Sequence, residues 1–434
     1  MNPFVTFPVL LLFCASSLHA QFTELAPMPE PVSNNAVAGA QVNGKNYVYS
    51  FCGIDSSKIW SGIHLKAWRY DVDAGEWTQL PDVPDPDGGK IAAAASAVNG
   101  KIYVIGGYHV AQSGNETSSN KVHVFDTQTN TWLADAAPVP VAIDDHVQVV
   151  WKDSLIYVVT GWSNTTNVNK VQVFDPSVNQ WSEGTPLPNQ NVYKVFGGAG
   201  TVVEDTIFYA GGAKATVNFP ATSTLRKGVI DPLDPTNITW SEMDEPAAKG
   251  YRMAATTFGG KAIWLGGSDV TYNFDGIAYS NSAGVPPLDR ITVFDPQNSS
   301  FFQTNGNMPA VMDLRGAAKI SEDEIIIAGG MAGGQQVSNK VWRIRLDKLS
   351  GVDDNEGELG FYKIYPNPSF DEINVEMRGR FEIEIYDAKG TLLFYDSARE
   401  QTSVNVAYFP AGIYWVDLTA ENGLRATEKV VIKK

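Results

Sequence analysis

The sequence predicts an all-β protein, a six-bladed β-propeller followed by a small C-terminal β-sandwich. Short strands that end at a glycine recur six times, an aromatic residue follows a turn at a regular distance in most copies, and the segment after residue 20 resembles a fourth strand of a repeat. A charged content of 18% beside 39 glycines suits a chain with many strands and turns.

The repeat is clearest between Asn99 and Trp132, where two strands, a glycine pair, a polar loop, a third strand and a turn lead to a tryptophan. The marker is Gly107, because glycine adopts positive φ at little cost where a strand must turn sharply. Its counterparts occur at intervals of 54, 54, 51, 55 and 63 residues, which is close to the period of a propeller blade. The six markers are Gly53, Gly107, Gly161, Gly212, Gly267 and Gly330.

An aromatic residue follows the third strand of most copies. It comes six residues after a strand-ending Asp in four copies and nine residues after Asp231 in the fourth. We interpret these residues as the core of the blades and therefore as scaffold. They are Trp77, Trp132, Trp181, Trp240 and Phe301.

Together the glycine pairs, the strand aromatics and the spaced tryptophans resemble the kelch-repeat family, over roughly residues 22–348. The sixth copy ends after its third strand, whereas Gln21–Pro29 is similar to Glu76–Pro84, a fourth strand. We therefore expect a propeller over residues 21–348 whose N-terminal strand completes the last blade. Such closure leaves only short, protected strand edges.

The first 20 residues have the pattern of a secretory signal peptide. An apolar run, Val5–Phe13, precedes small residues that end at Ala20, and the run is too short to span a bilayer in the mature chain. Cys14 offers a lipoprotein alternative, which the bulky Phe13 before it disfavours. Removal of residues 1–20 leaves Cys52 as the single cysteine, so no intramolecular disulfide can form.

The net charge of −16 argues against nucleic acid and against an anionic membrane surface as partners. We expect no membrane span in the mature chain. The acidic balance instead suits an exported protein that must stay soluble.

The composition changes after the propeller. Residues 349–360 are acidic and poor in apolar side chains, so we interpret them as a linker. Alternating apolar residues over 361–434 then predict about seven strands of a small β-sandwich.

This tail resembles the type A C-terminal sorting domain of the type IX secretion system. The resemblance implies recognition by the type IX machinery, export across both membranes of a Bacteroidota-type cell, and then release or surface attachment. A final KVVIKK segment supports it. The other residues that carry it are Tyr365, Pro366, Asn367, Pro368, Gly390 in IYDAKG and Gly412 in PAGIYWV.

We expect function on the face that holds the loops from second to third strands and from fourth to first strands. Counting back seven residues from the turn before each second strand gives six ring positions, of which His146, Arg252 and Arg315 can be cationic. This predicts a cationic funnel for an anionic or polyhydroxylated ligand; the alternative is that these residues form structural ion pairs. The six ring positions are Ala36, Ala92, His146, Gly197, Arg252 and Arg315. The candidate ligand-binding residues are Asp145, His146, Lys194, Tyr251, Arg252, Tyr272, Tyr279, Asp313 and Arg315.

The loop from Ser268 to Arg290 is the longest of its kind and is rich in aromatic residues. Tyr272, Phe274 and Tyr279 could stack on sugar rings, since each presents an apolar face. They could equally pin the loop onto the propeller.

The chain has no nucleophile elbow, zinc-protease, P-loop or calcium-loop motif, and we expect no metal and no cofactor. A His109–His146 metal site is the remaining option among its scattered histidines. We favour a secreted or cell-surface protein that binds a glycan or protein ligand through one loop-rich face. The alternative is an extracellular sugar mutarotase or epimerase that uses acid–base chemistry at the channel mouth, and a third option is an adhesion component without a small-molecule site.

Overall fold

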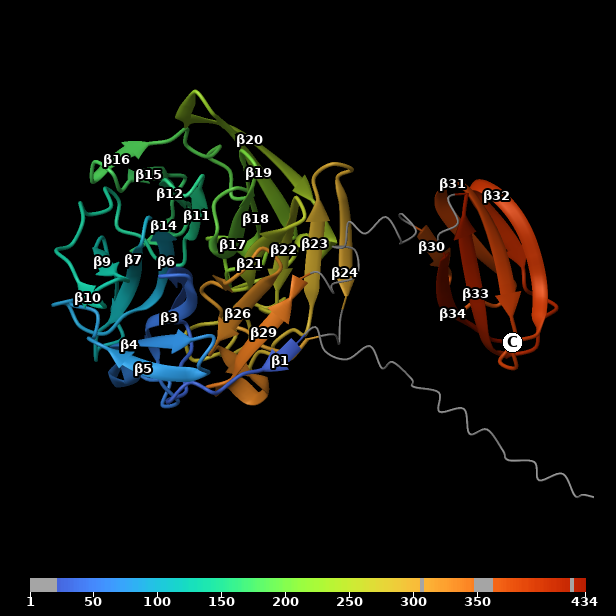
Figure 1. Cartoon of the computed structure of the whole chain (residues 1–434), viewed down its shortest axis with the longest axis horizontal. Helices are drawn as coiled ribbons and strands as arrows, with labels where there is room; N and C mark the ends of the chain where they lie inside the picture. The colour runs from blue at the N-terminus through green and yellow to red at the C-terminus, as the bar shows by residue number, and fades with distance from the viewer. Residues whose placement is uncertain (1–21, 305–307, 347–361, 422–424) are drawn as a thin grey trace, which may run out of the picture. The chain divides into compact units, whose positions relative to one another are not determined.

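The computed structural model describes residues 22–304, 308–346, 362–421 and 425–434, and it divides into two compact units, Met1–Asp353 and Asp354–Lys434. The predicted all-β class is confirmed, because strands make up the regular structure of the described residues apart from three short 3₁₀ turns. Figure 1 shows six sheets of the first unit arranged around one axis. The predicted signal peptide and linker lie outside the described residues.

The first three blades follow the chain in order, and each strand pairs antiparallel with the next. A short 3₁₀ turn, η1 (Trp60–Gly62), and three short extra strands lie in their loops. Blade one contains β2 (Ala36–Val42), β3 (Lys45–Ile54), β4 (Ile63–Asp71) and β5 (Glu76–Leu80). Blade two contains β6 (Ile91–Val98), β7 (Lys101–Val110), β9 (Val122–Asp126) and β10 (Thr131–Trp132), with β8 (Glu116–Ser118) on the end of β7. Blade three contains β11 (Val147–Trp151), β12 (Leu155–Val159), β15 (Val171–Asp175) and β16 (Gln180–Glu183), with β13 (Trp162–Ser163) and β14 (Thr166–Asn167) in its loop.

The last three blades repeat this order, and the final one takes its outermost strand from the start of the chain. Blade four contains β17 (Phe196–Val203), β18 (Thr206–Ala213), β19 (Thr224–Asp231) and β20 (Asp234–Asp244), followed by η2 (Pro246–Ala248). Blade five contains β21 (Ala254–Phe258), β22 (Lys261–Leu265), β23 (Ile291–Asp295) and β24 (Ser300–Thr304). Blade six contains β25 (Ala318–Lys319), β26 (Glu324–Ala328), β29 (Val341–Arg345) and β1 (Phe22–Glu24), with β27 (Met331–Ala332), η3 (Gly333–Gln335) and β28 (Gln336–Val337) in its loop.

Strand β1 closes the ring by pairing antiparallel with β29, with Phe22 opposite Ile344. In Figure 1 this blue strand therefore lies beside the orange strands of the last blade. Each outer strand of the closed ring pairs within its own blade. The unpaired strand edges are therefore six short ones, instead of the long edge of one open sheet.

The six marker glycines hold neighbouring blades together. Gly107 has φ of 88°, and its N–H donates to the carbonyl of Ile143 in the next blade at 3.0 Å. A Cβ on Gly107 would lie 2.7 Å from the Ile91 carbonyl oxygen, so no larger residue fits there without movement. The other five markers also have positive φ and donate to the next blade.

The spaced tryptophans make a second contact between blades, in the opposite direction. The indole Nε1 of Trp132 donates to the Pro81 carbonyl of the preceding blade at 2.8 Å, and Trp181 donates to Ala137 at 2.7 Å. The ring of Trp132 also packs edge-on against Phe125 at 5.0 Å. These residues therefore belong to the scaffold, as the sequence predicts.

The second unit contains five described strands around one apolar core: β30 (Tyr362–Tyr365), β31 (Glu372–Tyr386), β32 (Leu392–Asn405), β33 (Gly412–Ala420) and β34 (Arg425–Ile432). The first half of β31 pairs with β30 and its second half with β33, across a register shift between Met377 and Arg380. The number of strands is smaller than the seven predicted, because two pairs of predicted strands are continuous in β31 and β32.

Candidate functional site

Six equivalent residues stand where the chain enters each blade, either just before the innermost strand or at its second residue. Each lies two positions after the carbonyl that accepts from a marker glycine, and each has positive φ, between 46° and 65°. Positive φ is uncommon outside glycine, so five such non-glycine residues at one structural position indicate a shared constraint. The six are Asn34, Ala92, Asp145, Gly197, Arg252 and Asp313.

Hydrogen bonds join these six segments into a closed circle. Every segment donates to the segment of the preceding blade, five times from a backbone N–H to a carbonyl and once to the Oδ1 of Asn34. The bonds are Asn34 to Asp313 (3.2 Å), Ala92 to Asn34 (2.9 Å), Asp145 to Ala92 (3.1 Å), Gly197 to Asp145 (2.7 Å), Arg252 to Gly197 (2.8 Å) and Leu314 to Arg252 (3.0 Å). We call this circle the inner ring.

The ring positions counted from the sequence are corrected in three blades. The count is right for Ala92, Gly197 and Arg252, but it names Ala36, His146 and Arg315 where the structure places Asn34, Asp145 and Asp313. The error arises because the number of residues between the inner ring and the following turn differs among blades. One arginine flanked by two aspartates therefore stands where the sequence suggested three cations.

Arg252 lies at the centre of this charge cluster and is fully buried. Its Nε and Nη2 donate to the two carboxylate oxygens of Asp145 at 3.1 and 2.6 Å, and its Nη1 donates to Asp313 at 2.9 Å. Burial alone would lower the pKa of Arg252, but the charge of Asp145 outweighs it and raises that pKa well above its ordinary value. Arg252 is therefore permanently ionised and paired.

Arg315 and His146 lie beside this cluster and are also buried. Nη1 of Arg315 is 3.5 Å from Asp145, and its Nη2 donates to the carbonyl of His146 at 2.9 Å. Nε2 of His146 lies 2.9 Å from the side-chain oxygen of Gln148, and burial lowers the pKa of His146 to about 3. His146 is therefore neutral, and together with Arg315 it lines a cavity of about 130 Å³ between the innermost strands.

Tyrosines surround the guanidinium of Arg252 on its loop side. The Arg252 Cζ lies 5.1 Å from the Tyr251 ring centre and 5.5 Å from that of Tyr272, and the two rings are perpendicular at 5.0 Å. Such contacts between a cation and an aromatic face are favourable, most of all when both are desolvated. Burial raises the pKa of both tyrosines well above the ordinary value.

The outer part of this group reaches solvent through Tyr279 and Glu116. Tyr279 is half-buried and packs on Phe219 at 5.0 Å, while Glu116 is exposed at the start of β8. The surrounding loops still desolvate Glu116 enough to raise its pKa, which the charge of Arg252 partly offsets. We call Tyr108, Tyr279 and Glu116, which all lie within electrostatic range of Arg252, the mouth.

Of the nine residues predicted from the sequence, the structure brings eight into this neighbourhood and leaves Lys194 apart. The ammonium of Lys194 donates to Asn189 at 2.8 Å and is partly exposed. In the long fifth loop, Tyr272 is fully buried and pins the loop, whereas Tyr279 keeps an accessible edge.

Several residues of the cluster have no sequence motif. Ser33 donates to Asp313 at 2.5 Å, and Ser118 donates to the buried carboxyl of Asp144 at 2.6 Å. Burial and then the neighbouring charge of Asp145 raise the pKa of Asp144 well above its ordinary value, which favours its protonated form. Glu116 and Ser118 lie on a three-residue strand inside a loop, where alternation gives no signal.

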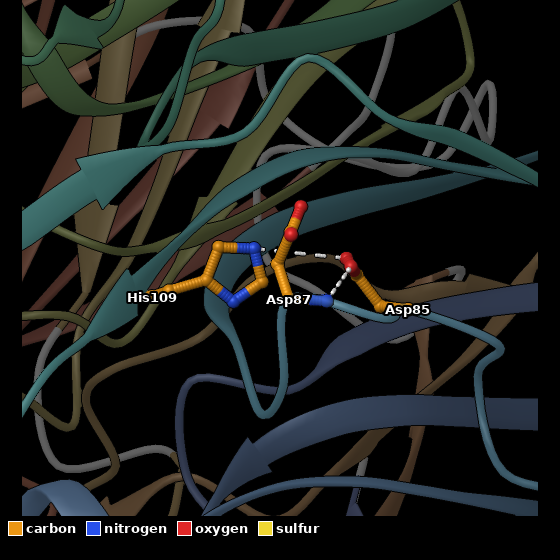
Figure 2. A group of neighbouring side chains, drawn as sticks. All are labelled: Asp85, Asp87 and His109. Atoms are coloured by element: carbon orange, nitrogen blue, oxygen red, sulfur yellow. Dashed lines mark hydrogen bonds and ion pairs between the residues drawn. The ribbon is translucent and has the colours of Figure 1, made fainter.

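A second polar cluster lies between blades one and two and includes Asp85, Asp87 and His109 (Figure 2). Asp85 accepts from Nε2 of His123 at 3.1 Å and is 2.9 Å from the ammonium of Lys90. Burial opposes its ionisation, but the hydrogen bond from His123 and the charge of Lys90 hold the pKa of Asp85 below its ordinary value. The Lys90 ammonium already pairs with this carboxylate and His123 contacts it, which makes it a poor ligand for a metal ion.

The two histidines of the alternative metal site, His109 and His146, are divided between the two clusters. Nδ1 of His109 contacts the Gly89 carbonyl at 3.0 Å, whereas His146 contacts Gln148. Cys52 lies close to Lys90, and burial raises the pKa of its thiol to about 12. That cysteine is therefore a neutral core side chain.

Comparison with known families agrees with this architecture. Residues 38–267, more than half of the chain, match the KLHDC2/KLHL20/DRC7 Kelch-repeats domain. The chain belongs to the kelch-repeat family. The solved structure of YjhT is similar in fold, with a TM-score of 0.56 and 18% identity, covering 72% of this chain and 95% of that one.

Curated relatives of this kelch protein match shorter stretches. An F-box/kelch-repeat protein of Arabidopsis thaliana is 38% identical over 77 residues, which is 18% of each chain. An N-acetylneuraminate epimerase of Pasteurella multocida is 27% identical over 150 residues, covering 35% of this chain and 36% of the relative. The chain thus spans between about a fifth and about a third of the length of these two relatives.

The C-terminal unit of the kelch protein has a separate match. Residues 363–433 match the secretion system C-terminal sorting domain, so the protein is exported to the cell surface or the extracellular space. In the sorting motif, the Asn367 side chain donates to the Lys429 carbonyl and accepts from the Val431 N–H, which joins the start of the domain to β34. Among the described residues, no helix has the length and apolar character needed to cross a bilayer.

Proposed function

We propose that this exported kelch propeller, after removal of residues 1–20, binds an extracellular glycan at the mouth above Arg252. One observation carries the proposal: a buried, ionised arginine is enclosed by tyrosine rings, and above it Tyr279 and Glu116 keep contact with solvent. A sugar offers hydroxyl groups to a carboxylate and an apolar ring face to a tyrosine.

Arg252 acts from below the mouth rather than by direct contact. Both of its carboxylate partners are in place, so its net effect is to fix the tyrosine rings in their perpendicular arrangement. A protein ligand would instead use exposed apolar side chains elsewhere on the loops, such as Ile59, Trp60 and Val217. We favour the glycan because an aromatic side chain and an acidic one lie together at the mouth, both within electrostatic range of Arg252.

A glycan-array screen of the full chain, followed by calorimetric titration of the strongest glycan, tests the proposal. Tyr279→Ala and Glu116→Gln should each weaken binding about tenfold, which corresponds to about 1.4 kcal/mol. Lys194→Ala is the matched control, since Lys194 lies apart from the mouth, and it should change binding less than about twofold. Binding to no glycan, or equal losses in all three variants, would reject the proposal.

A second candidate is a sugar mutarotase or epimerase. Glu116 and Asp144 both have raised pKa values near Arg252, a condition that favours acid–base chemistry near neutral pH, and the epimerase relative adds weight. NMR measurement of anomer exchange in array-positive sugars distinguishes the two candidates. Exchange faster than in buffer and lost in Glu116→Gln supports the enzyme, whereas exchange at the buffer rate supports binding alone.

A further inference from the structure

The sorting domain presents one sheet face to solvent over β32, β31 and β33. Alternate residues of these strands, among them Ile383, Ile385 and Val416, point inward and are buried in the core. Their neighbours along each strand point outward, because side chains alternate across a strand. A solvated sheet face normally carries polar residues.

This outward face instead carries four large apolar side chains, which we call the aromatic patch (Leu392, Tyr395, Ile413 and Trp415). Between 44% and 55% of the surface of each is exposed. The strand register places them together, because Tyr386 of the central strand pairs with Leu392 on one side and with Trp415 on the other. A contiguous exposed group of this kind marks an interaction surface rather than scattered surface residues.

Charged residues follow the aromatic patch in a fixed order along the same face. Glu384 pairs with Tyr395 on one side and Asp417 on the other, and Glu382 is next along β31. The charge of Glu382 raises the pKa of Tyr395, which shows how close the acidic groups lie. We call Glu382, Glu384 and Asp417 the acidic band.

Beyond the acidic band the face is hollowed. Arg380 and Arg399 stand directly opposite each other on neighbouring strands and line a groove of about 610 Å³, together with Glu382 and Glu421. Like charges directly opposite on a sheet destabilise it, so the arrangement has a cost for the isolated domain. The face thus runs from apolar to acidic to basic.

We propose that this face docks a protein of the type IX export machinery, one that presents an apolar centre, a basic band and an acidic end in the complementary order. The occupant follows from the domain itself, because residues 363–433 match a secretion sorting domain. Within the PAGIYWV segment, Tyr414 and Val416 account for folding, since both are buried. Ile413 and Trp415 are exposed and serve no contact within the core, so their apolar character is explained by a partner.

Export of the full chain from a cell with a type IX system tests this proposal. The double variant Ile413→Ser/Trp415→Ser should lower the extracellular fraction about tenfold and leave the protein in the periplasm. Glu384→Lys/Asp417→Lys should lower export by a similar factor, because it reverses the charge that faces the basic band of the partner. The control variants Phe370→Ser and Tyr408→Ser remove apolar residues that are even more exposed and lie outside the aromatic patch, and both should be exported normally.

Thermal unfolding of the purified variants separates docking from folding. The face variants should unfold near the wild-type temperature, since Ile413 and Trp415 are exposed and Glu384 and Asp417 are half-buried outside the apolar core. Normal export of the double variant overturns the proposal. A second combination of results also overturns it: the wild type forms a dimer in sedimentation, the double variant is a monomer, and both are exported equally. The face would then bind a second copy of the chain.

Discussion

Asp145 and Asp313 hold the same arginine, yet their removal should have different costs. Asp145 contacts Arg252 twice and Arg315 once, whereas Asp313 contacts Arg252 once and also accepts from Ser33. Asp145→Asn leaves two buried guanidinium groups with one carboxylate. Breaking a buried ion pair in this way costs about 3–5 kcal/mol of unfolding free energy.

Asp313→Asn leaves the two bonds from Arg252 to Asp145 intact, and the new amide oxygen can still accept from Ser33. Its expected cost is the loss of one charge-assisted hydrogen bond, about 1.5–3 kcal/mol. The backbone does not confuse the comparison, because φ is 46° at Asp145 and 63° at Asp313, a region that asparagine tolerates well.

Urea unfolding of the full chain, followed by tryptophan fluorescence, measures both costs. All but one of the 11 tryptophans lie in the propeller, so the signal reports that unit. The exposed Asp153, with φ of 47°, is the matched control, and Asp153→Asn should change stability by less than about 0.5 kcal/mol. An Asp313→Asn cost equal to or above that of Asp145→Asn would refute the assignment of Asp145 as the shared carboxylate.

Three further predictions concern the scaffold and the buried acid and imidazole. Gly107→Ala should lower the free energy of unfolding in urea by at least about 2 kcal/mol more than Gly114→Ala does. Both glycines have φ near 85°, but only Gly107 lacks space for a Cβ. Equal losses would contradict the contact between blades at Gly107. Burial raises the pKa of Asp144 in the folded protein, so the wild type loses stability as pH rises above the pKa of about 4 that this group has in the unfolded chain. Asp144→Asn should therefore gain stability relative to wild type between pH 5 and pH 8. A difference in unfolding free energy that stays constant over this range would show that Asp144 is ionised. The imidazole signals of His146 should not titrate in NMR spectra between pH 5 and pH 8, because its pKa lies near 3, and a midpoint near 6.5 would show that the ring is hydrated.

The propeller could be predicted because its determinants are local and repeated. Gly107 and its counterparts must have positive φ beside a neighbouring backbone, and Trp132 and its counterparts must reach a carbonyl of the preceding blade. These requirements place the same residue types at the same positions of nearly every repeat. Six copies of a weak pattern at a regular spacing together predict the fold strongly.

The strands of the sorting domain were harder to predict, because a glycine inside a strand gives the same local signal as a turn. Gly379 lies within β31 with φ of 85°, at the register shift where β31 changes its partner from β30 to β33. A bulge of this kind continues the strand while it interrupts the alternation of apolar residues. Periodicity alone therefore divides β31 into two strands.

The candidate site was predicted by residue type but not by register. Arg252 is paired with carboxylates 107 and 61 residues away, from blades three and six, and no spacing in the sequence encodes that pairing. The shift of one or two residues in three blades also exchanged an aspartate for a cation at two ring positions. Because net charge at a buried site depends on each such exchange, the predicted cationic funnel became a neutralised cluster.

The neutralised cluster changes where ligand recognition must be sought. Asp145, Arg252, Asp313 and Ser33 come from blades three, five, six and one, so their buried charges are satisfied only when all of these blades are in place. A partly closed ring would leave the Arg252 charge unpaired at a cost of several kcal/mol, which disfavours any other number of blades. The inner ring therefore specifies closure, and the ligand-binding role that we propose falls to Tyr279 and Glu116, which lie near Arg252 and keep contact with solvent.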